Sequence, residues 1–328
     1  MKQFNAFVLD KMKETPITEI RQLSMDDLPD GEVTIQVAYS SVNFKDGIVS
    51  MQQMFVESYP LIPGIDLAGF VIDSDDERFK AGDAVIVTSY ELGTSHHGGY
   101  SEIARVPAKW VVPLPDGLTL REAMILGTAG FTSGLSVQRL EDNGVHPSKG
   151  PVLVAGATGG VGSIAVHLLA SRGYEVVAST GKSDQHDYLK QLGASRIIDR
   201  ASVVDQGGPP VADEQWAAAI DPVGGKTLQY ILKSLQYGGS VATSGLTGGM
   251  EVATTVAPFI GRGINWLGID SVQCPMALRE KVWQQLATDL KANKINEAIV
   301  TEISLGDLPE VLENILAGNV RGRTIVKM

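Results

Sequence analysis

The sequence contains very little cysteine: among its 328 residues there is one, Cys274. A single thiol excludes an internal disulfide, so a reducing compartment, the cytoplasm, is the expected location. No apolar run is long enough to cross a bilayer, and the N-terminus lacks the basic and then apolar layout of a signal peptide. Basic residues are also in deficit, because the formal net charge is −11. We therefore expect neither nucleic acid nor a membrane as a partner.

What is present is typical of a globular chain, with 44% hydrophobic and 20% charged residues and enough length for two cores. Before about residue 125, short β-like segments are expected at 33–41, 69–73, 84–88 and 101–107. After it, strands at 151–155, 174–180, 195–199, 216–221, 239–245 and 264–270 alternate with helices that include 184–193 and 276–292. The last segment, 321–328, is β-like again. The pattern predicts an α/β fold with a doubly wound parallel sheet beside a β-rich part.

The segment "PVLVAGATGGVGSIAV" at 151–166 combines a short apolar strand, a glycine turn and helical spacing of apolar residues. Gly156, Gly159 and Gly162 recur at three-residue intervals. Such a turn lets backbone N–H groups approach a diphosphate, and the helix N-terminus adds partial positive charge. Glycines also permit close strand–helix packing without any ligand. The strand–turn–helix context favours a dinucleotide, with contacts predicted at Thr158, Gly159, Gly160 and Val161.

The type of dinucleotide is indicated by the end of the second strand, "VVASTGKSD". An NAD site usually carries an acidic residue there to hold the ribose hydroxyls, but Thr180, Gly181 and Lys182 take that place. Lys182 offers positive charge where a 2′-phosphate would lie, and Arg196 follows before the third strand. Both bases could instead be solvated surface charges. The missing acid and the added base favour NADPH.

Several motifs of a known superfamily follow one another in the expected order: "SSVNFKDGIV", "PLIPGIDLAGFV", "AGDAVIV", "GGYSEIARVP", "ILGTAGFTSGLSV" and "AGATGGVGS". On these motifs essentially the whole chain resembles the zinc-independent branch of the medium-chain dehydrogenase/reductase superfamily. "HHGGYSE", "SGLTGG", "GIDSV" and "RGRTIVK" resemble its acrylyl-CoA reductase and quinone oxidoreductase group. The resemblance implies a GroES-like β-rich catalytic domain over 1–122, completed by 300–328, and a Rossmann NADPH-binding domain over 123–299. It also implies a homodimer built by pairing edge strands, for which 264–270 is a plausible strand.

The ligands of a zinc dehydrogenase are largely missing from the sequence. Such an enzyme of this superfamily needs a Cys near residue 40, a His-Glu pair after the Pro-Gly, and a lobe with four Cys. Asn43 stands near the first place, Ile65-Asp66 replaces the pair, and one Cys cannot build a thiolate site. His96 and His97 border a substrate loop or lie in a plain surface loop. We predict no metal.

Without a metal, a conjugated C=C–C=O group is a better hydride acceptor than an isolated carbonyl, because hydrogen-bond donors suffice to hold the developing enolate oxygen. The resemblance implies NADPH-dependent reduction of a short 2-enoyl-CoA, acrylyl-CoA to propanoyl-CoA. One alternative is an enzyme that reduces quinones or free α,β-unsaturated carbonyls. Another is a nucleotide-binding protein without turnover.

The residues expected to act lie in "NFKD" and in late loops of the chain. Asn43 and Asp46 fit a hydrogen-bonded frame of the nicotinamide pocket, although Lys45 and Asp46 could equally form a surface ion pair. By resemblance Phe44 contacts the cofactor, where relatives often carry a Tyr that could donate a proton. Further cofactor contacts are predicted at strand ends, at Ser244, Gly245, Leu246, Ile269 and Ser271. By resemblance, at least one of the residues before the last strand also reaches the cofactor, with Asn319 and Arg323 as the predicted contacts. Arg321 and Arg323 could also be ordinary surface charges.

Overall fold

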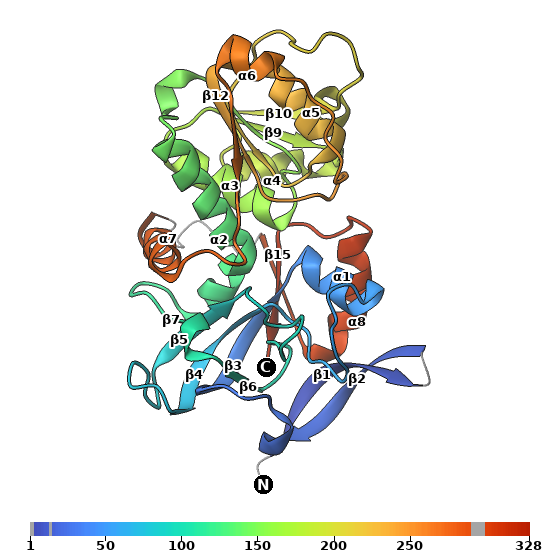
Figure 1. Cartoon of the computed structure of the whole chain (residues 1–328), viewed down its shortest axis with the longest axis vertical. Coiled ribbons are helices and arrows are strands. Elements are labelled where there is room, and N and C mark those ends of the chain that lie inside the picture. The colour runs from blue at the N-terminus through green and yellow to red at the C-terminus, as the bar shows by residue number, and fades with distance from the viewer. Residues whose placement is uncertain (1–2, 13–14, 290–298) are drawn as a thin grey trace. The chain divides into compact units, whose positions relative to one another are not determined.

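The computed structural model describes residues 3–12, 15–289 and 299–328 (Figure 1). The chain divides into two compact units, of which the first contains Met1–Thr128 and Val272–Met328 and the second contains Ala129–Ser271. From the sequence, the domain limits were predicted at 122/123 and 299/300. Residues 272–289 were therefore expected in the second unit, but they belong to the first. Arg279 accounts for this, because its buried guanidinium donates to the carbonyl and hydroxyl oxygens of Thr88 in the first unit. The domain limits themselves stay a prediction.

The first unit is built on a seven-stranded sheet, in the order β14-β15-β3-β4-β5-β7, with β6 paired to β3. Its strands are β3 (Val33–Val42), β4 (Asp66–Ser74), β5 (Ala84–Thr88), β6 (Ile103–Val106), β7 (Val111–Pro113), β14 (Val300–Ile303) and β15 (Arg323–Lys327). β15, from the end of the chain, pairs antiparallel with β3, so that Thr324 lies opposite Val42. A two-stranded ladder of β1 (Gln3–Met12) and β2 (Thr15–Ser24) was not predicted from the sequence.

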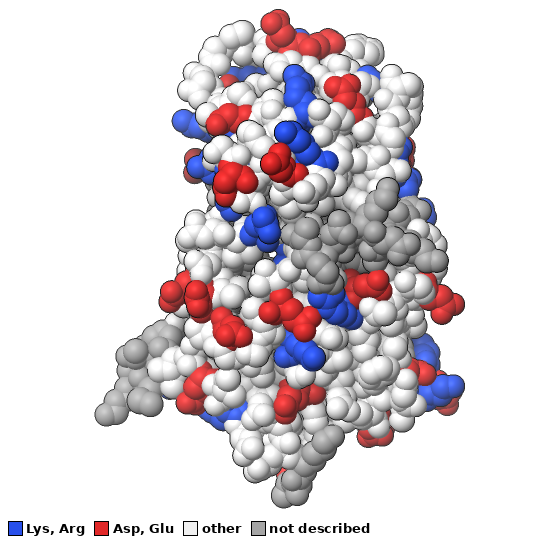
Figure 2. Space-filling model, turned by 180° about the vertical axis from the view of Figure 1, so that it is seen from behind, with Lys and Arg blue, Asp and Glu red and all other residues white. Residues whose placement is uncertain are grey.

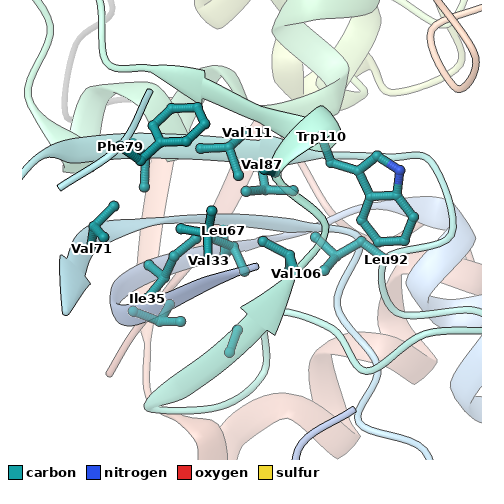
Figure 3. Packing of buried hydrophobic residues seen from close by; sticks show 14 residues of the cluster. Val33, Ile35, Leu67, Val71, Phe79, Val87, Leu92, Val106, Trp110 and Val111 are labelled. Carbon is teal, nitrogen blue, oxygen red and sulfur yellow. The ribbon is translucent and has the colours of Figure 1, made fainter. Parts of the chain in front are cut away.

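Apolar side chains fill one face of this sheet (Figure 3). Val33, Ile35 and Val37 alternate along β3 with residues that face away, which satisfies the period of a half-buried strand. They pack with Leu67 of β4 and Val87 of β5. Each such side chain contributes about 1.5–3 kcal/mol when fully buried. The packing therefore fixes the end of β3, and with it the position of the "NFKD" segment.

Helix α1 (Phe44–Gln52) follows β3 and lies beside α8 (Leu308–Leu316), as Figure 1 shows. A Cβ at Gly47 would lie 2.9 Å from Cγ of Leu316, so the two helices approach too closely for a larger residue. Helix α2 (Leu120–Asp142) is interrupted at Gly127, which has non-helical dihedral angles. Helix α7 (Met276–Asp289) agrees with the described part of the helix expected over 276–292, and residues 290–292 lie outside the described residues.

The segment before α7 is held by an aromatic stack. The ring of Tyr90 stacks on that of Trp110, with centroids 5.7 Å apart, and the guanidinium of Arg279 lies 4.4 Å from the centroid of Tyr90. The hydroxyl of Tyr90 donates to the carbonyl oxygen of Cys274 at 3.3 Å, and the Cys274 side chain is buried. The thiol thus belongs to the interior of the first unit.

The second unit contains a six-stranded parallel sheet in the order β10-β9-β8-β11-β12-β13, which confirms the predicted doubly wound architecture. Its strands are β8 (Val152–Val154), β9 (Val176–Thr180), β10 (Arg196–Asp199), β11 (Trp216–Asp221), β12 (Leu235–Thr243) and β13 (Asn265–Gly268). Its helices are α3 (Gly160–Ser171), α4 (His186–Gln191), α5 (Gly225–Ser234) and α6 (Ala257–Arg262). Because all strands run in one direction, their carboxyl ends meet along one edge, where ligands bind in such sheets.

Acidic and basic side chains are interspersed on the face drawn in Figure 2. That face offers no uniform basic surface of the kind that a nucleic acid backbone attracts. Within the described ranges, no helix combines the length and the apolar composition needed to cross a membrane.

Candidate functional site

Asn43 and Asp46 form a cap at the start of α1, directly after β3. The backbone N–H of Asn43 donates to Oδ2 of Asp46 at 2.8 Å, which is the reciprocal half of a capping box. Oδ1 of Asp46 accepts from the backbone N–H of Ile65 at 2.9 Å. Since Asp46 is 0% exposed, the alternative of a surface ion pair with Lys45 is wrong.

Asp66, at the start of β4, is a second buried carboxylate and accepts four hydrogen bonds. Its Oδ2 accepts from the Ser41 hydroxyl at 2.6 Å, the Asn43 amide at 2.8 Å and the Thr128 backbone N–H at 2.8 Å. Its Oδ1 accepts from the hydroxyl of Thr128 at 2.6 Å. A buried carboxylate is tolerated only with such partners. The Asn43 side chain is therefore a link between the ends of β3 and β4.

Arg323, at the start of β15, brings a buried cation to the same place. It is 2% exposed, so its interpretation as a solvated surface charge is wrong. Its guanidinium donates to the carbonyl oxygens of Ile125 and Val42, to Oδ1 of Asn43 at 3.2 Å and to the hydroxyl of Ser41 at 2.9 Å. These bonds direct the guanidinium to acceptors within the protein, and its predicted role as a cofactor ligand stays a prediction.

Gly127 makes room for this network, which we call the carboxylate–guanidinium cluster and define as Asn43, Asp46, Asp66 and Arg323. A Cβ at Gly127 would lie 2.6 Å from both Oδ2 of Asp66 and the Ser41 hydroxyl. Its dihedral angles, φ +50° and ψ −157°, are strained for any other residue. Gly127 was not predicted as part of a site, although a glycine inside a helical pattern is a recognisable signal of a close approach.

The electrostatics of the cluster follow from its burial. The pKa of Asp46 is raised to about 7, first by burial and second by the charge of Asp66, against the lowering effect of the N–H bonds from Ile65 and Asn43. Burial also lowers the pKa of Arg323, which the two carboxylates oppose. Asp46 thus holds its proton below about pH 7 and adds a negative charge to the cluster above it.

These residues do not fit a zinc ion. Where a zinc dehydrogenase would offer a thiolate and a His-Glu pair, this chain has the amide of Asn43, the aliphatic side chain of Ile65 and the carboxylate of Asp66, and the Arg323 guanidinium donates to the Asn43 amide. A fixed cation at this place competes with a bound metal. In the parts of the chain that the structure describes, no group of three or more His, Cys, Asp or Glu side chains converges as a metal site.

The two adjacent histidines have separate surroundings within the first unit. The ring of His96 packs edge-on against Trp110, with centroids 5.1 Å apart. Nδ1 of His97 accepts from the backbone N–H of Ile62 at 3.4 Å, and burial lowers the pKa of His97 to about 4. His97 is therefore neutral at physiological pH, and the two rings do not converge on one ion.

In the second unit, the three glycines after β8 serve different purposes. Gly156 has φ +56°, which favours glycine, and a Cβ at Gly162 would collide with the carbonyl oxygen of Gly156. A Cβ at Gly159 would meet that oxygen only at an ordinary 3.4 Å, so packing within the protein does not require glycine there. Gly159 precedes α3, whose first N–H groups have no partner within the helix. An open face at Gly159 beside these N–H groups suits a diphosphate.

Two cations lie where β9 and β10 end. A Cβ at Gly181 would lie 2.5 Å from Nε of Arg200, so the Arg200 side chain crosses the "TGK" turn. The pKa of Lys182 is lowered, mainly by burial and also by the nearby charge of Arg200, which Asp184 opposes. Arg196 instead stands at the amino end of β10, with its guanidinium 5.6 Å from the Trp216 ring. The geometry therefore favours Arg200 over Arg196 as a ligand of a 2′-phosphate.

Other predicted residues also lie at strand ends. Ser244, Gly245 and Leu246 follow β12, and Ile269 and Ser271 follow β13. The hydroxyls of Ser179, in β9, and Ser244 are buried without a hydrogen-bond partner. In the first unit, Phe44 is half-buried at the start of α1, and Asn319 is exposed after α8.

Residues 29–116 match the family model of the alcohol dehydrogenase GroES-like domain, and residues 160–289 match that of the zinc-binding dehydrogenases. "Putative quinone oxidoreductase YhfP" of Bacillus subtilis is 53% identical over 326 residues, covering 99% of both chains. Acrylyl-CoA reductase AcuI of Ruegeria pomeroyi is 49% identical over 326 residues, covering 98% of both. The chain belongs to the medium-chain dehydrogenase/reductase superfamily.

Solved structures of this superfamily have the same fold. The yhdH oxidoreductase of Salmonella enterica, solved in complex with NADP, is 44% identical with a TM-score of 0.96, covering 99% of both chains. Bacillus subtilis yhfP, solved with NAD bound, is 53% identical with a TM-score of 0.97, covering 100% of both. The predicted GroES-like and Rossmann architecture is confirmed, and this member of the superfamily is an oxidoreductase.

The raised pKa of Asp46 predicts a pH-dependent stability. The folded state keeps a proton that the unfolded chain releases near pH 4, so the free energy of unfolding falls as pH rises from about 4 to about 7. Asp46→Asn removes this titration. Urea denaturation across that range gives the free energy of unfolding of both proteins. The value for Asp46→Asn minus that for the unmodified protein should rise with pH.

A matched control is Asp307→Asn, because hydrogen bonds from Ser304 lower the pKa of Asp307. The stability that this group adds is lost only as pH falls below about 4, so its difference should stay constant above pH 5. A constant difference for Asp46→Asn as well would contradict the assignment.

Proposed function

We propose that the protein reduces the C=C bond of a short 2-enoyl-CoA, acrylyl-CoA to propanoyl-CoA, with NADPH and without a metal. The observation that carries the proposal is the 49% identity to acrylyl-CoA reductase AcuI over 98% of the chain. A probable acrylyl-CoA reductase AcuI of Escherichia coli is 44% identical over 98% of the chain. When bound, NADPH supplies a hydride for the β-carbon of the substrate, and a proton added at the α-carbon completes the reduction.

The second unit supplies groups suited to this cofactor. The N–H groups at the start of α3 suit the diphosphate, with Thr158, Gly159, Gly160 and Val161 around it. Lys182 and Arg200 suit the 2′-phosphate, because a phosphate would relieve the repulsion between two neighbouring cations. This supports NADPH, although the relative solved with NAD bound is the more similar in sequence.

The first unit contributes a rigid frame in this proposal. Asp46 is fully buried, so we assign it and Asn43 to fixing the start of α1 rather than to proton transfer with substrate. Phe44, the first residue of α1, has no proton to donate. The proton for the α-carbon must therefore come from another donor. A thioester needs only modest hydrogen-bond donors for its enolate, because it forms an enolate more readily than an oxygen ester does.

A second candidate function is the reduction of quinones or free α,β-unsaturated carbonyls with the same hydride. It is favoured by the name of the Bacillus subtilis relative, which is 53% identical. The two candidates differ in whether a CoA moiety contributes binding energy far from the reacting bond. A non-catalytic role has less support, since both the glycine turn and the cap of α1 are intact.

The cofactor proposal predicts a selective effect of Arg200→Ala. The preference for NADPH over NADH should fall about tenfold, or roughly 1.4 kcal/mol, because only NADPH carries the 2′-phosphate. Lys182→Ala should act in the same direction. Arg196→Ala is the matched control and should leave the preference within about twofold. Dissociation constants from fluorescence titration test this, and equal losses for both cofactors would refute the assignment.

The substrate proposal predicts a large advantage of the thioester. The kcat/KM for acrylyl-CoA should exceed that for acrylate or a simple enone at least about a hundredfold, or roughly 2.7 kcal/mol. NADPH oxidation with acrylyl-CoA, a longer enoyl-CoA, acrylate and a quinone in parallel measures it. Faster turnover of the quinone would favour the second candidate. Equal kcat/KM values for acrylate and acrylyl-CoA would exclude a preference for the thioester.

We also propose a homodimer that pairs two copies of β13. This strand ends the sheet of the second unit, and Trp266 on it is 41% exposed. Val256 and Ile260 nearby in the chain are 70% and 82% exposed. Pairing would give hydrogen-bond partners to the backbone N–H and C=O groups at the open edge of β13, and it would cover apolar surface.

Light scattering at micromolar concentration should therefore give about twice the 34.9 kDa of one chain. Ile260→Lys should shift the mass toward one chain without lowering secondary-structure content, because it places a charge in the expected contact. Met54 is an exposed apolar residue of the first unit, so Met54→Lys is the control and should leave the mass unchanged. A monomeric mass for the unmodified protein would rule the dimer out.

A further inference from the structure

Asp221, the last residue of β11, is a buried carboxylate that the proposed reaction does not use. Its Oδ1 accepts from the backbone N–H groups of Val223 at 2.9 Å and Gly224 at 3.1 Å. Its Oδ2 also accepts from Gly224, at 3.1 Å. Gly224 and Gly225 have φ of +73° and +52°, so the backbone of this turn is held in an uncommon shape. The carboxylate thus fixes the turn 222–225.

The turn 222–225 contacts the glycine turn that follows β8. A Cβ at Gly156 would lie 3.1 Å from Cγ2 of Val223 and 3.8 Å from Cγ of Pro222. The backbone of residue 156 therefore lies directly against the side chains of the turn. The glycine turn thus forms a fixed wall on one side of Val223.

The same turn holds the segment 244–249 from the opposite side. The N–H of Gly248 donates to the carbonyl oxygen of Val223 at 2.7 Å, and the hydroxyl of Thr247 donates to the carbonyl oxygen of Pro222 at 3.3 Å. A Cβ at Gly248 would lie 2.7 Å from Cγ1 of Val223. The two methyl groups of Val223 thus face different segments, because Cγ2 lies against Gly156 and Cγ1 lies against Gly248. The turn sets the spacing between the glycine turn and the segment that carries Leu246.

The strand order indicates which half of a dinucleotide this spacing affects. β9, with Lys182 after it, lies on one side of β8, while β11 and β12 lie on the other. If the diphosphate binds after β8 and the 2′-phosphate near Lys182, the adenosine half covers the end of β9. The nicotinamide half then covers the ends of β11 and β12.

We propose that Asp221 is a positioning residue for the nicotinamide half of the dinucleotide, acting through the turn 222–225 on the segment 244–249. The proposal rests on the dinucleotide binding proposed above. Asp221 has no role in it as a proton donor or as a direct ligand. Its carboxylate determines where the neighbouring backbone stands.

The ionisation of Asp221 adds a measurable signature. Burial raises the pKa of Asp221 to about 6, against the lowering effect of the N–H bonds from Val223 and Gly224. The segments around it, 155–159, 222–225 and 244–249, contain no charged residue, and Lys226 is the nearest one along the chain. Protonation turns one accepting oxygen into a hydroxyl, so the bond from Gly224 to Oδ2 weakens below about pH 6.

Two ligands separate a local effect from general destabilisation. NADP⁺ occupies both halves of the site, whereas adenosine 2′,5′-bisphosphate occupies the adenosine half alone. By calorimetry at pH 8, Asp221→Ala should weaken NADP⁺ about tenfold and the bisphosphate by less than about twofold. Asp307→Ala, which removes a carboxylate that accepts a turn N–H in the first unit, should change neither.

Asp221→Asn tests the same idea if the alanine variant does not fold. The amide oxygen can still accept both N–H bonds that Oδ1 accepts, so NADP⁺ affinity at pH 8 should stay within about threefold. As pH falls from 7.5 to 5, the ratio of NADP⁺ to bisphosphate affinity in the unmodified protein should fall relative to the same ratio in Asp221→Asn. The 5′-phosphate of the bisphosphate is a monoester that takes up a proton near pH 6, while the diphosphate of NADP⁺ does not, and this effect of the ligand cancels between the two proteins.

Equal weakening of both ligands by Asp221→Ala would overturn the proposal, as would the same pH profile of the ratio in Asp221→Asn and the unmodified protein. If the unmodified protein does not bind NADP⁺ at all, the proposed function fails together with this inference. If NADP⁺ binds and the Asp221 variants behave like the unmodified protein, only this inference fails.

Discussion

Two buried carboxylates and one buried guanidinium constrain the first unit more than any other contact. Asp46 and Asp66 come from α1 and β4, while Arg323 comes from β15 near the end of the chain. Leaving one buried charge unpaired costs about 3–5 kcal/mol, so these elements must meet in one arrangement. Gly127 lets α2 enter the same place, because it adds no Cβ beside Asp66 and Arg323. The start of α1 is therefore fixed by electrostatics as well as by apolar packing.

The parts of the fold with local signals could be predicted from the sequence. The parallel sheet follows from alternating strands and helices, and the glycine turn follows from the spacing of Gly156, Gly159 and Gly162. The β1–β2 ladder was not predicted, because nothing in its apolar pattern was singled out. The burial of Arg323 could not be predicted either, since its partners are provided by residues about 200 to 280 positions away.

Arg200 shows the same limit at the cofactor site. Arg196 was predicted as a cofactor contact because it stands just before the third strand, but direction along that strand decides which end faces a ligand. Arg196 begins β10 and packs on Trp216, while Arg200 follows its carboxyl end and crosses Gly181. Four residues of a strand span about 13 Å, so this choice moves the charge from one edge of the sheet to the other. Strand direction, which is a property of the folded sheet, therefore favours Arg200 over Arg196 in the cofactor proposal.

The buried position of Cys274 has a practical consequence. The side chain is 3% exposed, and its backbone carbonyl is held by the Tyr90 hydroxyl within the aromatic stack that also holds Arg279. A buried thiol reacts with alkylating reagents only when its surroundings open. Because the chain has one cysteine, every modified molecule carries a single label at a known place. The rate at which Cys274 is alkylated therefore measures how often the segment before α7 detaches from Tyr90.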